Sequence, residues 1–241
     1  MKVLLILCIV VVTAVGCGVN RSSFSPGKKY SPGQLQKDYS IYRETLETHH
    51  PGLYWYAGKD SMDHYFEQGR EQLNDSLTEP QFRKILSWVT AKISCGHTTV
   101  RPSKSWNKYS DTTRLGKMFP LSVKVWDAAM VVTQNLNRRD TVLKRGTIIT
   151  SINGKTKESL VDTLFDYIST DGFNHTHKYQ SLSNRGFFGS LYSNLYGLSE
   201  KYTVEYKDST GRLKNISIPV YNPAADSAGR SGTRTFRPAT Q

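Results

Sequence analysis

Hydrophobic residues recur at every third or fourth position in three successive segments between residues 31 and 94. This spacing places the apolar side chains along one face of an α-helix. Tight turns separate the segments, so the pattern predicts a small three-helix bundle over residues 31–100. The three apolar stripes consist of Leu35, Tyr39, Tyr42 and Leu46, of Met62, Tyr65, Phe66, Leu73 and Leu77, and of Phe82, Ile85, Leu86, Val89 and Ile93.

The beginnings of these helices carry signals of their own. Ser31 is a capping residue, and Pro32 after it is tolerated in a first helical turn. Thr78 with Gln81 three residues later forms a capping box, which gives the third helix the most clearly defined start. The second helix is expected to extend from about residue 60 to residue 77.

Apolar and polar residues alternate in the second half of the chain, which is the pattern of half-buried strands. An α+β fold is therefore predicted, in which residues 115–222 form a small, partly open β-barrel with one or two helices. The expected elements are a hairpin from FPLSVKVW and AMVVTQN, a short strand ending at Asn153-Gly154, a helix carrying Leu160, Val161, Leu164, Phe165 and Ile168, and a final hairpin around Ser209, Thr210 and Gly211.

Residues 169–197 form a connection that is long for a compact domain, with a weakly helical second half. His175 and His177 alternate within it, so on a strand they would share a face, as two metal ligands do. Asp171 is the only other ligand-type residue close in sequence. The prediction is that both histidines lie at the surface or at a domain interface and bind no metal.

The net charge of +12 is high, but lysine and arginine are scattered along the chain. Nucleic-acid binding would require these charges on one face or within a recognisable motif, and neither is visible. The charge therefore predicts a basic soluble surface, with attraction to an anionic membrane or cell-envelope polymer as the alternative.

The first 17 residues have the layout of a secretory signal, with one lysine, an apolar run and then small residues. The run is too short to span a bilayer comfortably. Its end, Ala14-Val15-Gly16-Cys17, resembles a bacterial lipobox, which implies lipidation of Cys17 and a bacterial cell-envelope location facing the periplasm. An ordinary cleaved signal and an uncleaved anchor are the alternatives. Residues 18–30 are rich in Gly, Ser, Pro and Lys and are expected to be a flexible tether.

Removal of Cys8 and lipidation of Cys17 would leave Cys95 as a single thiol, which cannot form an internal disulfide. Cys95 is then either buried and inert or an exposed nucleophile. Burial is the prediction, because free cysteine is among the most buried residue types. No cofactor and no metal are expected.

The order of elements over residues 115–222 resembles a PDZ domain. The run from Gly146 to Gly154, GTIITSING, is similar to the Gly-x-x-Ile-x-x-Ile-Asn-Gly run of bacterial protease PDZ domains, with Thr147 at the usual position of Asp. This resemblance implies binding of extended peptides by strand addition at a sheet edge. The expected partner is a peptide or an unfolded protein, and no oligomeric state is predicted.

A helical bundle that ends in Ser94-Cys95-Gly96-His97-Thr98 and precedes a PDZ-like domain resembles the N-terminal half of a family S41 serine peptidase. The Gly-His-Thr run is similar to the family's Asp-Gly-His-Thr element, with Cys95 in place of Asp. In the tricorn-like branch this His is the base toward a distant serine, which implies that His97 is a general base. In the processing-protease branch a Ser-Lys dyad acts, and His97 would be structural; a metal-ligand role is a third alternative.

Residues 223–241 lack apolar periodicity and are expected to be a disordered tail or the start of a missing catalytic domain. The run from Gly229 to Gly232, GRSG, lacks the flanking strand and helix of a nucleophile turn. The nucleophile is therefore expected beyond this chain, which alone should not hydrolyse peptides. The chain is then a piece of an S41 peptidase, a non-catalytic lipoprotein that binds peptides through its PDZ-like domain, or an inactive remnant.

Overall fold

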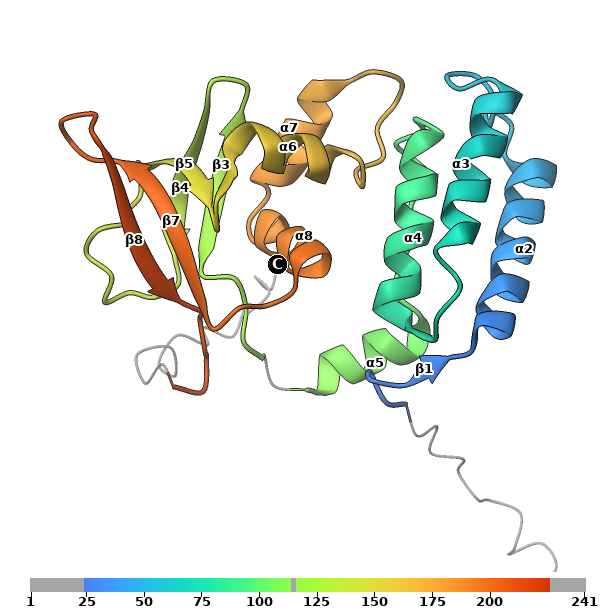
Figure 1. Ribbon diagram of the computed structural model, residues 1–241, viewed down its shortest axis with the longest axis horizontal. Coiled ribbons are helices and arrows are strands. Elements are labelled where there is room, and N and C mark those ends of the chain that lie inside the picture. The colour runs from blue at the N-terminus through green and yellow to red at the C-terminus, as the bar shows by residue number, and fades with distance from the viewer. Residues whose placement is uncertain (1–23, 114–115, 226–241) are drawn as a thin grey trace, which may run out of the picture.

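The computed structural model describes residues 24–113 and 116–225. A bundle of helices and an antiparallel sheet stand side by side, and helices that belong to the sheet region lie between the two (Figure 1). The mixture of helices and an antiparallel sheet confirms the predicted α+β fold class. No helix within the described ranges has both the length and the apolar character needed to cross a membrane.

The bundle consists of α2 (Pro32–His49), α3 (Lys59–Glu71) and α4 (Glu79–Lys92), as the apolar stripes predict. Both expected caps are confirmed: Ser31 caps α2, and the backbone N–H of Thr78 donates to Gln81 Oε1 over 2.8 Å at the start of α4. Its core is formed by Leu35, Tyr39, Leu46, Leu53, Met62, Phe66, Leu73, Ile85, Val89 and Ile93.

Two sequence expectations in this region are wrong. Helix α3 ends at Glu71 rather than near residue 77, because the Asn74 side chain donates to the Glu71 carbonyl and closes the helix. Residues Leu77–Thr78 instead form β2, which pairs with β1 (Lys29–Tyr30). The last residues of the expected tether are therefore part of a small sheet, and the rest of that segment up to residue 23 lies outside the described residues.

Helix α5 (Lys104–Thr112) has no counterpart in the sequence prediction, and none of its residues is buried. It begins at Ser103, whose hydroxyl accepts the Trp106 backbone N–H over 3.0 Å and donates to Glu79 Oε2 over 2.7 Å. Phe24 contacts the rings of Trp106 and Tyr109, so this helix packs against the start of the described chain.

The main sheet is antiparallel and has the strand order β3-β4-β5-β7-β8, with β6 paired to β5. The predicted turn at Asn153-Gly154 is confirmed, since both residues have positive φ, and helix α6 follows it. The expected first and final hairpins are also present. The elements are β3 (Leu121–Trp126), β4 (Ala129–Asn135), β5 (Ile148–Ile152), β6 (Lys155–Thr156), α6 (Lys157–Phe165), β7 (Lys201–Lys207) and β8 (Leu213–Pro219).

The sheet does not close into a barrel. The sequence predicted a partly open barrel, and the structure has an open antiparallel sheet instead. A bridge joins Met118 and Tyr221, the residues that flank the two edge strands, where each backbone N–H donates to the other residue's carbonyl over 3.0 Å.

The segment 169–197 is mostly helical, which corrects the expected long connection. It contains α7 (His175–Ser183), capped by the Asn174 side chain, and α8 (Phe187–Tyr196), which ends at Gly197 with positive φ. Aromatic side chains of α8 enter the core of the sheet region: Phe188 and Tyr192 contact the ring of Phe119 at centroid distances of 5.7 and 5.1 Å. This packing accounts for the burial of these two aromatic side chains.

Candidate functional site

Two loops meet at the junction between the bundle and the sheet region. The first follows α4 and contains Ser94 to Thr98, and the second precedes α7 and contains Asp171. The backbone N–H of Gly96 donates to Asp171 Oδ1 over 2.7 Å, and the N–H of Gly172 donates to the Ser94 carbonyl over 2.9 Å. These bonds fix the exit of the bundle against a loop more than 70 residues later in the chain.

His97 extends from this junction into solvent. Its side chain is 90% exposed, and its Nδ1 lies 3.8 Å from Asp171 Oδ1. An exposed imidazole beside a carboxylate can accept a proton and then be stabilised as imidazolium by the negative charge. The structure thus gives His97 a potential orienting partner that the sequence analysis did not identify for it.

An open groove of about 630 Å³ lies beside these loops. Its lining includes His49, His50, Trp55, Tyr56, His97 and Asp171. The Trp55 side chain is 77% exposed, and nearby Phe173, 79% exposed, contacts the Tyr56 ring edge-to-face at 6.0 Å. Exposed aromatic side chains around a groove indicate a surface that binds another molecule or another part of a protein.

His50 is a second histidine of this groove that the sequence analysis did not select. Its Nε2 lies 2.8 Å from Thr98 Oγ1, while its Nδ1 is buried and has no hydrogen-bond partner among the described residues. The available signal in the sequence was the pair of adjacent histidines in Thr48-His49-His50-Pro51.

Cys95 is partly buried rather than fully buried, and it packs on the edge of the bundle core. Its sulfur also lies close to the two titratable groups of the site: the Cys95 thiol, one ring nitrogen of His97 and one carboxylate oxygen of Asp171 are within 4.8 Å of one another. The predicted full burial of the Cys95 thiol is therefore wrong: the residue is partly buried, and its sulfur faces other reactive groups.

His175 and His177 lie in α7 rather than on a strand, so they do not share a face, and both are exposed, which confirms the predicted surface position. The His175 ring packs against Phe165, and His177 Nε2 lies 3.4 Å from Ser181 Oγ. Asp171 belongs to the His97 site instead.

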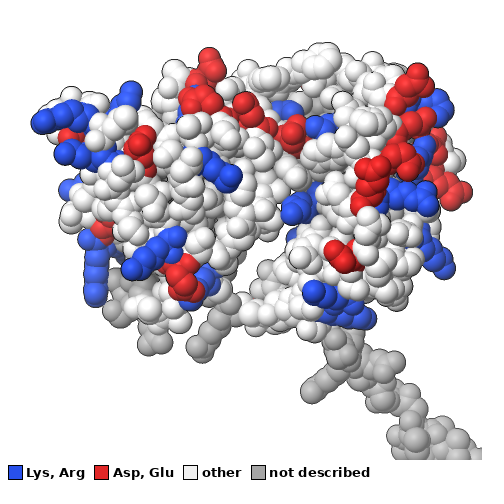
Figure 2. Space-filling model, in the orientation of Figure 1, with Lys and Arg blue, Asp and Glu red and all other residues white. Residues whose placement is uncertain are grey.

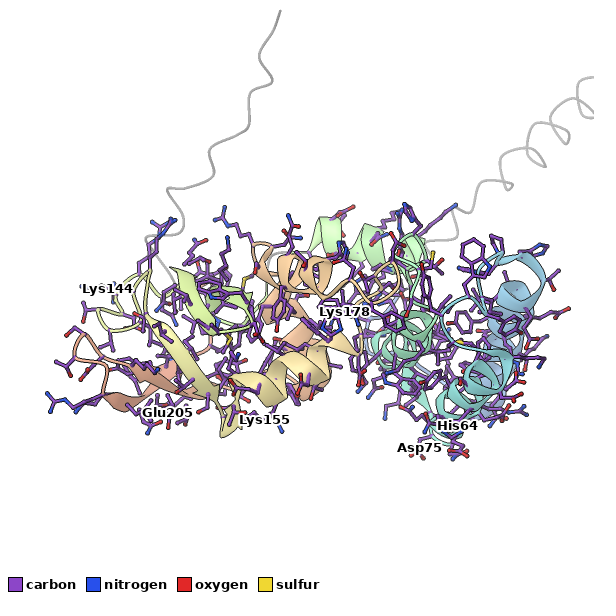
Figure 3. The ribbon with its side chains drawn as sticks, turned by 90° about the horizontal axis from the view of Figure 1, so that it is seen from above. His64, Asp75, Lys144, Lys155, Lys178 and Glu205 are labelled. Carbon is purple, nitrogen blue, oxygen red and sulfur yellow. The ribbon has the colours of Figure 1, made fainter. Side chains whose placement is uncertain are left out.

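Lys178 of α7 lies near the junction of the two regions (Figure 3). Burial lowers its pKa, which is a feature of lysines that act as bases. Its ammonium group donates to the Phe165 carbonyl over 2.9 Å, which is a structural contact.

The free edge of β3 is partly occupied by α7. Ser183 Oγ accepts the backbone N–H of Val125 over 2.9 Å and donates to the Tyr179 carbonyl over 2.7 Å. An extended peptide that added a strand at this position would have to displace the Ser183 hydroxyl. The expected mode of PDZ binding is therefore not available at this point of the β3 edge.

The Ser183→Ala substitution is expected to destabilise the protein by about 1–3 kcal/mol, because it leaves the Val125 N–H without a partner in a buried strand. Chemical denaturation measures the change. Ser181→Ala on the same helix is the matched control and should change the free energy of unfolding by less than about 0.5 kcal/mol. Equal effects of the two substitutions would contradict the assignment of Ser183 as the partner of the β3 edge.

Acidic side chains gather over α2 and α3, whereas lysine and arginine are dispersed over the same view of the molecule (Figure 2). This face shows no continuous basic surface.

Comparison with known proteins shows similarity in fold. No protein-family model matches the sequence, and no curated protein matches it. Two structures of CPAF, a chlamydial serine protease of the tail-specific, S41-like type, resemble it: one of a point mutant, and one of the mature protein complexed with lactacystin. Each gives a TM-score of 0.50 at 12% identity, over 79% and 78% of this chain and 34% and 35% of theirs.

The likeness to CPAF concerns the fold alone. The chain spans about a third of the length of the CPAF chains, so it corresponds to a portion of them. Three sequence predictions lie outside the described residues: the secretory signal, the lipidation of Cys17, and the nature of the chain from residue 226 onward, including GRSG.

Proposed function

We propose that this chain is the N-terminal portion of an S41-type serine peptidase of the bacterial cell envelope, anchored through Cys17, in which His97 is the general base. The observation that carries the proposal is the position of His97: exposed, beside Asp171, at the edge of an open groove. The fold likeness to a serine protease supports the same assignment.

In this proposal, His97 takes the proton of a serine hydroxyl while that oxygen attacks the peptide carbonyl, and later returns the proton to the leaving amine. Asp171 stabilises the imidazolium formed between these steps. The serine belongs to an α/β domain that lies beyond this chain. The groove with Trp55 and Tyr56 contacts the substrate or that catalytic domain.

A second candidate function is a non-catalytic envelope lipoprotein that binds peptides through its PDZ-like sheet region. The observation that favours it is strand β8, which is mostly exposed and pairs on one side only with β7 among the described strands. Such an edge can accept an added strand. The expected result is binding of peptides with a free C-terminus to residues 31–222 with a Kd of roughly 1 μM.

The size and activity of the native protein test the two candidates. An antibody against residues 31–222 would recover it from cell-envelope fractions for mass determination and a peptide-cleavage assay with and without a serine-directed fluorophosphonate. The peptidase proposal expects a species well above 27.3 kDa whose cleavage activity the reagent abolishes. A species at or just below that mass, inactive both alone and with the proteins recovered beside it, would favour the peptide-binding lipoprotein.

A further inference from the structure

Three different metal-ligating groups lie close together in the structure, and they belong to Cys95, His97 and Asp171. A thiol, an imidazole nitrogen and a carboxylate oxygen lie within 4.8 Å of one another. Two of these residues come from the loop after α4, and the third comes from the loop before α7. The chain therefore forms the cluster only when the bundle and the sheet region are docked.

The distances fit a small tetrahedral ion after minor side-chain rotation. Zinc bonds of about 2.0–2.3 Å place neighbouring ligand atoms about 3.3–3.6 Å apart. His97 Nδ1 and Asp171 Oδ1 are already 3.8 Å apart, and the separations from the Cys95 sulfur need to close by about 1.3 Å at most. The His97 and Asp171 side chains are 90% and 63% exposed, so they are free to make this adjustment.

The backbone around the cluster is held while the ligand atoms stay available. The Gly96 N–H occupies one lone-pair site of Asp171 Oδ1 and fixes the carboxylate, which leaves the second site of that oxygen for a metal. The Gly172 N–H and the Thr98 N–H bind the carbonyls of Ser94 and Cys95 and hold the two loops. Within the described ranges, neither the Cys95 thiol nor the His97 ring makes a hydrogen bond that a metal would have to break.

We propose that Cys95, His97 and Asp171 bind a zinc ion, with the fourth coordination position open to the groove. A thiolate and an imidazole together favour zinc over the hard cations Mg²⁺ and Ca²⁺, which take oxygen ligands. Binding replaces the proton of the Cys95 thiol, which is released to solvent. Zinc on one His97 nitrogen leaves the ring proton on the other, so neither nitrogen can accept the serine proton and zinc would hold the peptidase inactive; this last consequence alone rests on the proposed function.

Titration with Co²⁺, a spectroscopic substitute for zinc, tests the site. The protein is the full chain with Cys8→Ala and Cys17→Ala, so that Cys95 is its only thiol. We expect about one Co²⁺ per chain in a tetrahedral environment, with a thiolate-to-cobalt band in the near ultraviolet and ligand-field bands in the visible. Zn²⁺ should displace the cobalt and abolish the bands.

Single substitutions then identify the ligands. Cys95→Ser should remove the thiolate band, and His97→Ala and Asp171→Ala should each weaken binding at least about tenfold. His177→Ala and Asp75→Asn, which alter the same residue types outside the cluster, should bind as the parent chain does. Absence of cobalt and zinc binding, or binding unchanged by all three cluster substitutions, would overturn the site. The readout needs no cleavage activity, so this failure would leave the general-base proposal standing.

Discussion

Replacement of His97 by alanine is expected to reduce peptide cleavage by the complete peptidase by about 10²–10⁴-fold, the contribution of a positioned general base. The melting temperature should change little, because the side chain is 90% exposed and makes no hydrogen bond within the described part of the chain. A large loss of activity without a loss of stability distinguishes a base from a structural histidine. Steady-state kinetics and thermal denaturation of the same preparation measure both.

The matched control is His64→Ala in α3, on the side of the bundle away from the junction (Figure 3). This variant should retain full activity. Asp171→Asn should lower kcat less than His97→Ala does, because the amide oxygen can still accept the Gly96 N–H while the charge that stabilises imidazolium is lost. Full activity of the His97→Ala enzyme would place the protein in the Ser-Lys branch and assign His97 a structural role.

Replacement of Phe66 by alanine is expected to destabilise the protein by about 3–5 kcal/mol, the range for deleting a buried aromatic ring. Phe66 is fully buried in α3 and contacts the ring of Tyr42 edge-to-face at 6.4 Å. The Arg43 guanidinium lies 4.9 Å from the centre of the Phe66 ring. Removal of the ring would leave a cavity between α2 and α3 and withdraw the surface under Arg43. Chemical denaturation followed by circular dichroism measures the change.

Ile41→Ala in α2 is the matched control for this substitution. It also shortens a large apolar side chain of the bundle, but Ile41 is 53% exposed, so its free energy of unfolding should change by less than about 0.5 kcal/mol. Similar losses for Phe66→Ala and Ile41→Ala would show that α2 and α3 do not pack as described.

Local signals predicted the elements that depend on neighbouring residues. The capping box of Thr78 and Gln81 fixes the start of α4, and Asn153-Gly154 makes its turn with the positive φ values that these residue types tolerate. The end of α3 was missed because a side-chain bond from Asn74 overrides an apolar pattern that continues to Leu77.

Elements that depend on distant contacts were the ones that sequence patterns could not predict. Helix α5 has no fully buried residue and packs on Phe24, which lies about 80 residues earlier in the chain, and α8 is held by aromatic packing against Phe119. The same distinction between local signals and distant contacts applies to the residues of the site. His97 was identified from its local run, whereas Asp171 is brought to it by a bond to Gly96 across 75 positions of sequence.

The bond between Gly96 and Asp171 also means that the site is assembled from two parts of the molecule. A bundle expressed alone would contain Cys95 and His97 without their carboxylate, and a sheet region expressed alone would contain the carboxylate with nothing to orient or ligate. Any event that separates the two parts, such as a cut in residues 98–120 followed by dissociation, would therefore dismantle the site without altering a single one of its residues. The site therefore exists only while the two parts are docked against each other.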